Sequence, residues 1–214
     1  MNYASLKKRD IANGKGVRVS LFVSGCTHRC PDCFNSEAWD FNYGEPFTDD
    51  TVNEIISLLS PDYIEGLSLL GGEPFEPQNQ AELLPLVRRF RSEYPTKNIW
   101  CYTGYLFEDI LCGKVGDKQT ANELLSYIDI LVDGRFVKDL KNVSLKFKGS
   151  SNQRIIDVKK SLNSREVILS QIDLENNDIL NRRSLKQNNW SHKQKKSIAN
   201  KPSKRRQKES GGSG

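Results

Sequence analysis

Residues 19–35 read VSLFVSGCTHRCPDCFN, so an apolar run leads directly into a loop rich in cysteine. The loop places Cys26, Cys30 and Cys33 in the spacing Cys-x3-Cys-x2-Cys. Thiolates are protein ligands of iron–sulfur clusters and also of zinc. Three thiolates on one short loop can bind three irons of a [4Fe-4S] cluster and leave the fourth iron open for chemistry. The spacing therefore indicates a cluster with one free iron.

A structural zinc site is the alternative interpretation of these cysteines. It needs four Cys or His ligands in closed tetrahedral geometry, and His28, Cys101 or Cys112 would have to supply the fourth. Zinc ligands usually come as pairs, whereas here three thiols crowd one loop without a second pair, which favours the cluster. We interpret His28 as an ordinary loop histidine, the alternative being a residue that supports the ligands of the site through a contact of its own. We interpret Cys101 and Cys112 as small buried apolar residues.

The apolar run from Val17 to Val23 predicts a strand, and the sequence beyond it alternates between two patterns. Short apolar runs predict strands at 66–70, 98–103 and 128–132, and helical spacing predicts helices at 48–60, 80–94 and 104–127, the last interrupted at 113–116. Pro85 is expected to bend the second helix or to mark a late start. The alternation favours an α/β fold with a parallel sheet and helical crossovers.

A motif follows each predicted strand at its carboxyl end, where parallel sheets usually bind ligands. The cysteine loop follows the first strand, residues 71–74 the second, 102–105 the third and 133–136 the fourth. The second motif, Gly71-Gly72-Glu73-Pro74, is on its own often only a tight turn. After a cysteine triad it indicates a ligand-binding turn, because glycines let the backbone approach a ligand and Glu73 can accept a hydrogen bond from an ammonium group. Together the motifs suit a bound amino acid.

Charge separates the chain into two parts. Residues 170–214 hold eleven of the 32 Lys and Arg and four of the 27 Asp and Glu, so residues 1–169 keep 21 basic and 23 acidic side chains. The body therefore lacks the basic surplus of a nucleic-acid-binding protein. We expect residues 1–169 to form one domain. We expect residues 170–214 to form a basic, disordered tail with a linker-like Gly-Gly-Ser-Gly end.

The cellular location is inferred from the cysteines and from the apolar segments. Five cysteines are an odd number, and three of them are clustered. No apolar stretch resembles a signal peptide or is long enough to span a bilayer. A disulfide framework is therefore not expected, and we expect a cytoplasmic protein that is not attached to a membrane.

The cysteine triad followed by Gly71-Gly72-Glu73 resembles the radical S-adenosylmethionine enzymes. Further blocks narrow the resemblance to the glycyl-radical activases of the anaerobic ribonucleoside-triphosphate reductase: residues 10–14 (DIANG), 100–105 (WCYTGY), 129–136 (DILVDGRF) and 148–153 (KGSSNQ). The resemblance covers roughly residues 1–169. Asp32 stands where many members of the superfamily carry an aromatic residue, and Phe34 after the third cysteine agrees with the narrower group.

The resemblance implies two cofactors, a [4Fe-4S] cluster and S-adenosyl-L-methionine. It implies that Cys26, Cys30 and Cys33 bind the cluster, that Gly71, Gly72 and Glu73 position the methionine end, and that Asp32, Cys33 and Phe34 lie along the nucleotide. Reductive cleavage of S-adenosylmethionine then gives a 5′-deoxyadenosyl radical, which takes a hydrogen atom from a glycine of the partner. The cofactors carry this chemistry, so no protein side chain is nominated as catalytic.

The implied partners are the large subunit of the anaerobic ribonucleoside-triphosphate reductase and a low-potential electron donor such as flavodoxin. The implied fold is an incomplete (partial) β/α barrel of the radical SAM type, because a body of about 169 residues is too short for the full eight-unit barrel, which typically needs about 250. There are three alternatives. The first is another radical SAM enzyme, such as a formate-lyase-type activase or a small-molecule mutase; the second is a zinc-binding interaction module; the third is a nucleic-acid binder that acts through the basic tail.

Overall fold

The computed structural model describes residues 1–180. Contacts divide the chain into a compact unit, Met1–Asn176, and a second unit, Asn177–Gly214. The predicted tail at 170–214 lies mostly outside the described residues, and its disorder stays a prediction. The compact unit extends past residue 169, because Ser170, Asp173 and Asn176 are buried in it.

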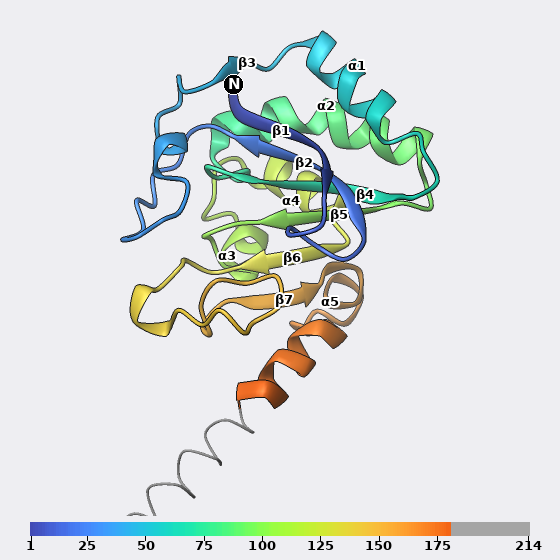
Figure 1. Ribbon diagram of the computed structural model, residues 1–214. Coiled ribbons are helices and arrows are strands. Elements are labelled where there is room, and N and C mark those ends of the chain that lie inside the picture. Colours follow the sequence, from blue (N-terminus) through green and yellow to red (C-terminus); the bar gives the residue numbers. More distant parts are fainter. Residues whose placement is uncertain (181–214) are drawn as a thin grey trace, which may run out of the picture. The chain divides into compact units, whose positions relative to one another are not determined.

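One sheet forms the centre of the compact unit (Figure 1). Within residues 1–180 its strands are β1 (Asn2–Asp10), β2 (Val17–Val23), β3 (Glu45–Pro46), β4 (Ile64–Gly71), β5 (Asn98–Tyr102), β6 (Ile130–Asp133) and β7 (Arg154–Asp157). The helices are α1 (Asp49–Leu58), α2 (Pro77–Glu93), α3 (Phe107–Cys112), α4 (Lys118–Tyr127) and α5 (Val158–Ser164), with short 3-10 helices η1 (Ser36–Trp39) and η2 (Lys138–Leu140). Residues 171–176 are also helical and end the unit. No helix in the described part of the chain combines the length and apolarity needed to cross a membrane.

The strands lie in the order β3-β1-β2-β4-β5-β6-β7. β2, β4, β5 and β6 pair in parallel, and the crossovers between them contain α1, α2, and α3 with α4. These are the four strands that the sequence predicts. β1, β3 and β7 were not predicted, and they pair antiparallel at the two sides of the parallel part. The fold is a mixed α/β fold, which confirms the predicted class with parallel strands.

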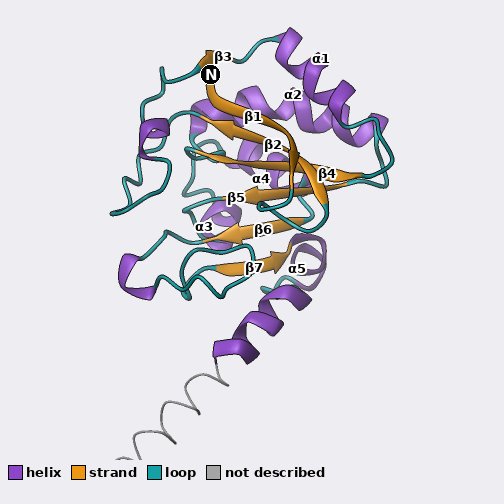
Figure 2. Cartoon of the chain, in the orientation of Figure 1, coloured by secondary structure: helices purple, strands orange, loops and turns teal. Residues whose placement is uncertain are grey.

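The two faces of the sheet carry different side chains. On β2, Val19, Leu21 and Val23 are fully buried and belong to the main core with α1 to α5, which lie on one face of the sheet (Figure 2). Trp100 and Val132 belong to a smaller buried cluster. Because side chains alternate between the two faces of a strand, this second cluster lies on the face opposite the helices. Phe147 and Ile172 pack against this second cluster.

Local sequence explains how α1 and α2 form. Thr48 and Thr51 make a reciprocal capping box at the start of α1. α2 begins at Pro77, whose missing N–H is not needed in a first turn. It also runs through Pro85, where we expected a bend or a late start. Leu84 and Leu86 beside this proline are buried, and their burial offsets the lost backbone hydrogen bond.

Candidate functional site

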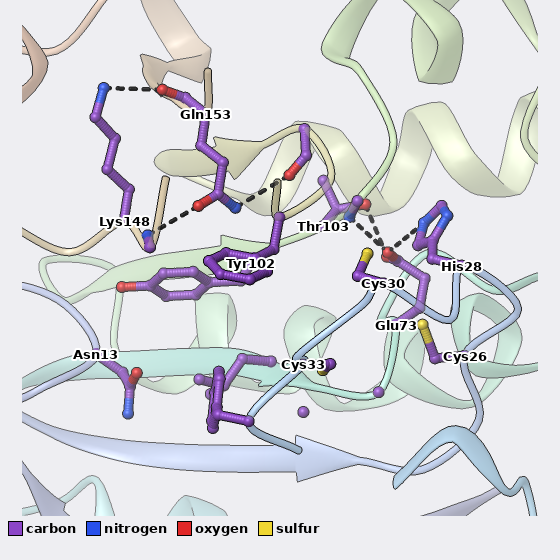
Figure 3. Close-up of a pocket in the computed structure, with 18 of the residues that line it drawn as sticks. Asn13, Cys26, His28, Cys30, Cys33, Glu73, Tyr102, Thr103, Lys148 and Gln153 are labelled. Atoms are coloured by element: carbon purple, nitrogen blue, oxygen red, sulfur yellow. Dashed lines mark hydrogen bonds and ion pairs between the residues drawn. The ribbon is translucent and has the colours of Figure 1, made fainter. Parts of the chain in front are cut away.

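A cavity of about 460 Å³ lies at the carboxyl ends of the parallel strands. Segments that follow β2, β4, β5 and β6 all contribute to its wall, and in Figure 3 the three cysteines of the loop stand around it. The wall contains every residue that the sequence nominated: Cys26, Cys30, Asp32, Cys33, Phe34, Gly71, Gly72 and Glu73. The volume is within the range of about 300–1,000 Å³ that is usual for small-molecule sites.

The backbone of the cysteine loop is held by neighbouring segments. Cys26 N donates to the carbonyl oxygen of Trp39 at 3.2 Å. Thr27 donates from its backbone N at 2.7 Å and from its hydroxyl at 2.6 Å to Oε1 of Glu76. Glu76 is buried at the start of α2. The first half of the loop is therefore fixed by protein contacts.

Burial shifts the thiols of Cys26 and Cys30 toward their neutral form. Burial raises the pKa of Cys26 to about 11, and burial also raises the pKa of Cys30. Iron binds the thiolate, so binding of a cluster must release these protons. Three cysteine sulfurs lining one cavity are the donor set that a [4Fe-4S] cluster takes, and the residues present fit that group.

The described residues do not contain a ready site for a single metal ion. Among residues 1–180, no group of three or more His, Cys, Asp or Glu side chains is arranged to hold one. A [4Fe-4S] cluster binds each thiolate through a different iron, so the three sulfurs need not meet at one ion. The zinc alternative requires four ligands around one ion, and the described part of the chain does not present that group.

The two cysteines outside the loop differ from each other. Cys101 is fully buried on the core face of β5, as predicted. Cys112 is exposed at the end of α3, so its interpretation as a buried residue is wrong. The helix ends there at Gly113, which adopts a left-handed conformation. Cys112 therefore lies on the surface and away from the cavity wall.

Glu73 joins three segments of the chain beside the cysteine loop. Its Oε1 accepts hydrogen bonds from Phe75 N (2.8 Å) and Thr103 Oγ1 (2.7 Å). Its Oε2 accepts from Gly104 N (2.7 Å) and interacts with His28 Nε2 (3.0 Å). A carboxylate has about four acceptor positions, so protein donors occupy all of them. The predicted contact between Glu73 and a ligand amine stays a prediction.

His28 belongs to this buried junction, so its interpretation as an ordinary loop histidine is wrong. Its side chain is 4% exposed, and its ring lies edge-on to Tyr105 with the centroids 4.3 Å apart. A Cβ atom on Gly104 would lie 2.4 Å from the imidazole ring. Gly104 therefore makes room for His28. The sequence shows this glycine but not its neighbour, which is why the role of His28 was missed.

Gly71 and Gly72 bring the end of β4 against the cysteine loop. Gly71 has φ +110°, and a Cβ there would lie 2.7 Å from the backbone of Phe22. A Cβ on Gly72 would lie 2.5 Å from the carbonyl oxygen of Gly25. These glycines therefore let the end of β4 pack closely against β2 and the cysteine loop. Their approach to a ligand stays a prediction.

Asp32 and Phe34 lie in the outer part of the cavity wall. Asp32 has φ +58°, and its carboxylate pairs with Nζ of Lys138 at 2.8 Å. Both side chains of this pair are more than half exposed. Phe34 is 85% exposed. Their predicted contacts with a nucleotide stay predictions.

Three further residues of the wall were not nominated individually, although the sequence blocks that contain them were singled out. Tyr102 lies along the cavity in Figure 3, and its buried hydroxyl has no hydrogen-bond partner among the described residues. Lys148 Nζ donates to the carbonyl oxygen of Gln153 at 2.8 Å. Gln153 Nε2 donates to the carbonyl oxygen of Gly134 at 3.0 Å. Short polar blocks predict a site but do not show which side chain faces it.

Comparison with known proteins supports the assignment of a [4Fe-4S] cluster to this chain. A family model described as a 4Fe-4S single cluster domain matches residues 12–156, which confirms the predicted cluster domain. An anaerobic ribonucleoside-triphosphate reductase-activating protein of Escherichia coli (strain K12) is 44% identical over 155 residues, which are 72% of this chain and 96% of the relative. Proteins of the same name are 44% identical in Enterobacteria phage T4 (72% of this chain, 93% of the relative) and 43% identical in Haemophilus influenzae (72% and 97%).

Proposed function

This chain belongs to the family of the anaerobic ribonucleoside-triphosphate reductase-activating proteins, and we propose from this that it activates such a reductase by generating a glycyl radical on it. The observation that carries the proposal is the cavity that Cys26, Cys30 and Cys33 share with the Gly71-Gly72-Glu73 turn. We propose that the large subunit of the reductase carries the target glycine.

Cys26, Cys30 and Cys33 are the residues that would bind the [4Fe-4S] cluster. Three thiolates leave one iron without a protein ligand, and we propose that the amine and carboxylate of S-adenosyl-L-methionine bind there. A cluster held there and reduced by a low-potential donor would supply the electron for reductive cleavage of the C5′–S bond of S-adenosylmethionine. The products would be methionine and a 5′-deoxyadenosyl radical, which would take a hydrogen atom from the glycine Cα. The chain itself orients the reactants and excludes water.

The turn at residues 71–73 has two tasks in this proposal. Glu73 keeps the cysteine loop beside the β5 end through His28, Thr103 and Gly104. Because its acceptor positions are filled, recognition of the ligand amine falls mainly to main-chain oxygens of the Gly71-Gly72 turn. No side chain is needed as an acid or base, since the reaction at the glycine transfers a hydrogen atom and not a proton.

The outer part of the cavity is where the partner would enter. Phe34, Val137, Leu140 and Val143 are exposed apolar side chains. Phe34 lies in the cavity wall, and so do Phe136, Lys141 and Leu145 from the segment that carries the other three. We propose that these side chains contact the glycine-bearing segment of the reductase. The sheet is open, with β3 and β7 at its ends, which supports a partial barrel of the radical SAM type with an open side for that segment.

Anaerobic reconstitution with iron and sulfide, followed by dithionite and S-adenosylmethionine, tests the proposal. We expect a brown protein that forms 5′-deoxyadenosine and, with the reductase added, an electron paramagnetic resonance signal of a glycyl radical on the reductase. Reduced flavodoxin should replace dithionite if the donor is a cytoplasmic low-potential protein.

Two results would contradict it. A colourless protein that contains zinc would favour the interaction module. Formation of 5′-deoxyadenosine without any radical on the reductase would favour another radical SAM enzyme.

A further inference from the structure

We propose that residues 170–176, here called the C-terminal strap, position one wall of the cavity and thereby set the affinity for S-adenosylmethionine. The match to the family model ends at residue 156, so the strap lies beyond the part of the chain that the family model matches. The ligand named here rests on the function proposed above. The structural half of the inference, that the strap orders this wall, does not depend on it.

The wall in question is the segment 145–153, here called the wall segment. Leu145, Phe147, Lys148, Gly149 and Gln153 line the cavity from it. Its end is fastened by the Gln153 side chain, whose Oε1 accepts from the backbone N of Gly149 at 2.8 Å and of Ser150 at 3.1 Å. Figure 3 shows Gln153 between Lys148 and the strand ends. The beginning of the wall segment needs other supports.

Asp173 of the strap supplies a buried charge to the wall segment. Its Oδ1 accepts from Nζ of Lys148 at 2.6 Å, and the two side chains are 3% and 1% exposed. The same oxygen accepts from the backbone N of Ile155 in β7 at 3.1 Å. A buried ammonium group without its carboxylate is strongly unfavourable. Lys148 therefore keeps its place in the wall only while Asp173 is beside it.

The side chain of Asn176 binds the backbone of the wall segment. Its Oδ1 accepts from Lys146 N at 2.8 Å, and its Nδ2 donates to Lys146 O at 3.0 Å. Asn176 is fully buried, so both polar atoms would lose their partners without Lys146. This pair of bonds fixes the residue that precedes Phe147.

An apolar contact completes the strap. Ile172 and Phe147 both pack against the buried cluster of Trp100, Val132 and Ile155. The rings of Phe147 and Trp100 meet edge-on with centroids 5.4 Å apart. Phe147 lines the cavity, so the strap supports a side chain that faces the ligand site. Three kinds of contact, ionic, backbone and apolar, thus join one short segment to one wall.

The test uses full-length chains with single substitutions in the strap, Asp173→Asn and Asn176→Ala. The matched control is Glu175→Gln, on the same helical segment. Its ion pair with Lys146 also reaches the wall segment, but the two side chains are 46% and 54% exposed, and such exposed pairs contribute little. Amide hydrogen exchange is measured on the protein before any cofactor is added. We expect the amides of Lys146, Gly149 and Ser150 to exchange about tenfold faster in the two strap variants, while α2 and the control stay unchanged.

The second measurement is formation of 5′-deoxyadenosine by the reconstituted variants. We expect KM for S-adenosylmethionine to rise about tenfold in both strap variants with kcat within about twofold of the original chain. A general loss of folded protein would instead lower the apparent kcat, because fewer molecules are active, and it would speed amide exchange in α2 as well. To test the ionic contact itself, Asp173→Asn is also made in a Lys148→Met background. There it should change KM by less than about twofold, because no buried ammonium needs the carboxylate and the Asn oxygen can still accept from Ile155 N.

Unchanged exchange of the wall segment in both strap variants would overturn the inference. Faster exchange with an unchanged KM would overturn its second half, the link to ligand affinity. If the original chain forms no 5′-deoxyadenosine at all, the proposed function fails, while the exchange result still decides whether the strap orders the wall.

Discussion

The Nε2 atom of His28 lies 3.0 Å from Oε2 of Glu73, with 4% and 1% of these side chains exposed. This contact joins the middle of the cysteine loop to the turn after β4. An ionised carboxylate can only accept hydrogen bonds, so the imidazole donates from Nε2. The loop that carries the thiols is therefore attached to the sheet by a buried polar contact at its centre.

Replacing Glu73 by Gln should detach the loop. The NH2 of the new amide would face either Phe75 N and Thr103 Oγ1 or Gly104 N and His28 Nε2. In either orientation at least one backbone N–H loses its acceptor. We expect the free energy of unfolding to fall by about 2–4 kcal/mol and the iron content after anaerobic reconstitution to fall as well. Urea unfolding and iron analysis measure both. Glu54→Gln, at an exposed pair with Lys8, is the control; equal stability of the two variants would contradict the junction.

Replacing Gly72 by Ala should push the turn away from the loop. The added Cβ would lie 2.5 Å from Gly25 O and 2.8 Å from Ala38 O, and backbone atoms cannot move aside without cost. We expect a loss of about 1–3 kcal/mol in stability, measured by urea unfolding. Gly149→Ala is the milder comparison, since the three atoms nearest to its Cβ would all belong to side chains, the nearest at 3.1 Å. If Gly149→Ala lowers the free energy of unfolding more than Gly72→Ala does, the close backbone contact at Gly72 is not important for stability.

Replacing Cys30 by Ala should abolish cluster binding and leave the fold intact. Its thiol is partly exposed at the cavity wall, so its loss creates no large hole in the core. We expect loss of the brown colour and of 5′-deoxyadenosine formation, with an unfolding transition within about 1 kcal/mol of the original. Visible absorption after reconstitution reports the cluster. Cys112→Ser, at an exposed thiol outside the cavity, should keep both; retention of full activity by Cys30→Ala would exclude the triad as ligand set.

Asp129 should make the stability depend on pH in the acid range. Burial acts to raise its pKa, but hydrogen bonds from Lys159, Arg91 and the backbone of Ile99 outweigh this, and the pKa is lowered from 3.8. Because this pKa is lower in the folded than in the unfolded protein, the ionised Asp129 stabilises the fold at any pH above the unfolded-state pKa. This stabilisation is lost as the pH falls through the folded-state pKa.

The corresponding variant is Asp129→Asn. Its deficit in unfolding free energy relative to the original chain should narrow as the pH falls from about 6 to about 3. Urea unfolding at several pH values measures this difference. Asp62→Asn, at an exposed position, is the control and should show no such trend. A deficit that stays constant with pH would contradict the ionic role of Asp129.

The sequence predicted the parallel part of the fold because β2, β4, β5 and β6 are apolar runs that end at motifs with glycine. It did not predict β1, whose segment NYASLKKRD is largely polar and only partly buried. β3 has two residues and β7 has four, too few to show a period. These strands form because partners elsewhere in the chain offer them an edge. That information is not local.

For the site, the sequence predicted which segments meet but not what each side chain contacts. All nominated residues line the cavity, because parallel strands bring their carboxyl ends to one edge. The burial of His28 and the four hydrogen bonds to Glu73 depend on a meeting of segments far apart in the chain. The strap was missed for another reason. Five of its seven residues are polar, so we assigned it to the tail, and Ile172 and Leu174 are too few to show a buried face.

The Glu73 junction also bears on how the protein is made. Its partners His28 and Thr103 are 45 and 30 residues away along the chain, so closing it requires two long loops to form first. During synthesis the three cysteines leave the ribosome long before Thr103 does. The thiols are therefore open to oxidation and to stray metals in the nascent chain. We therefore expect iron and sulfide to be inserted after translation, once the junction has closed.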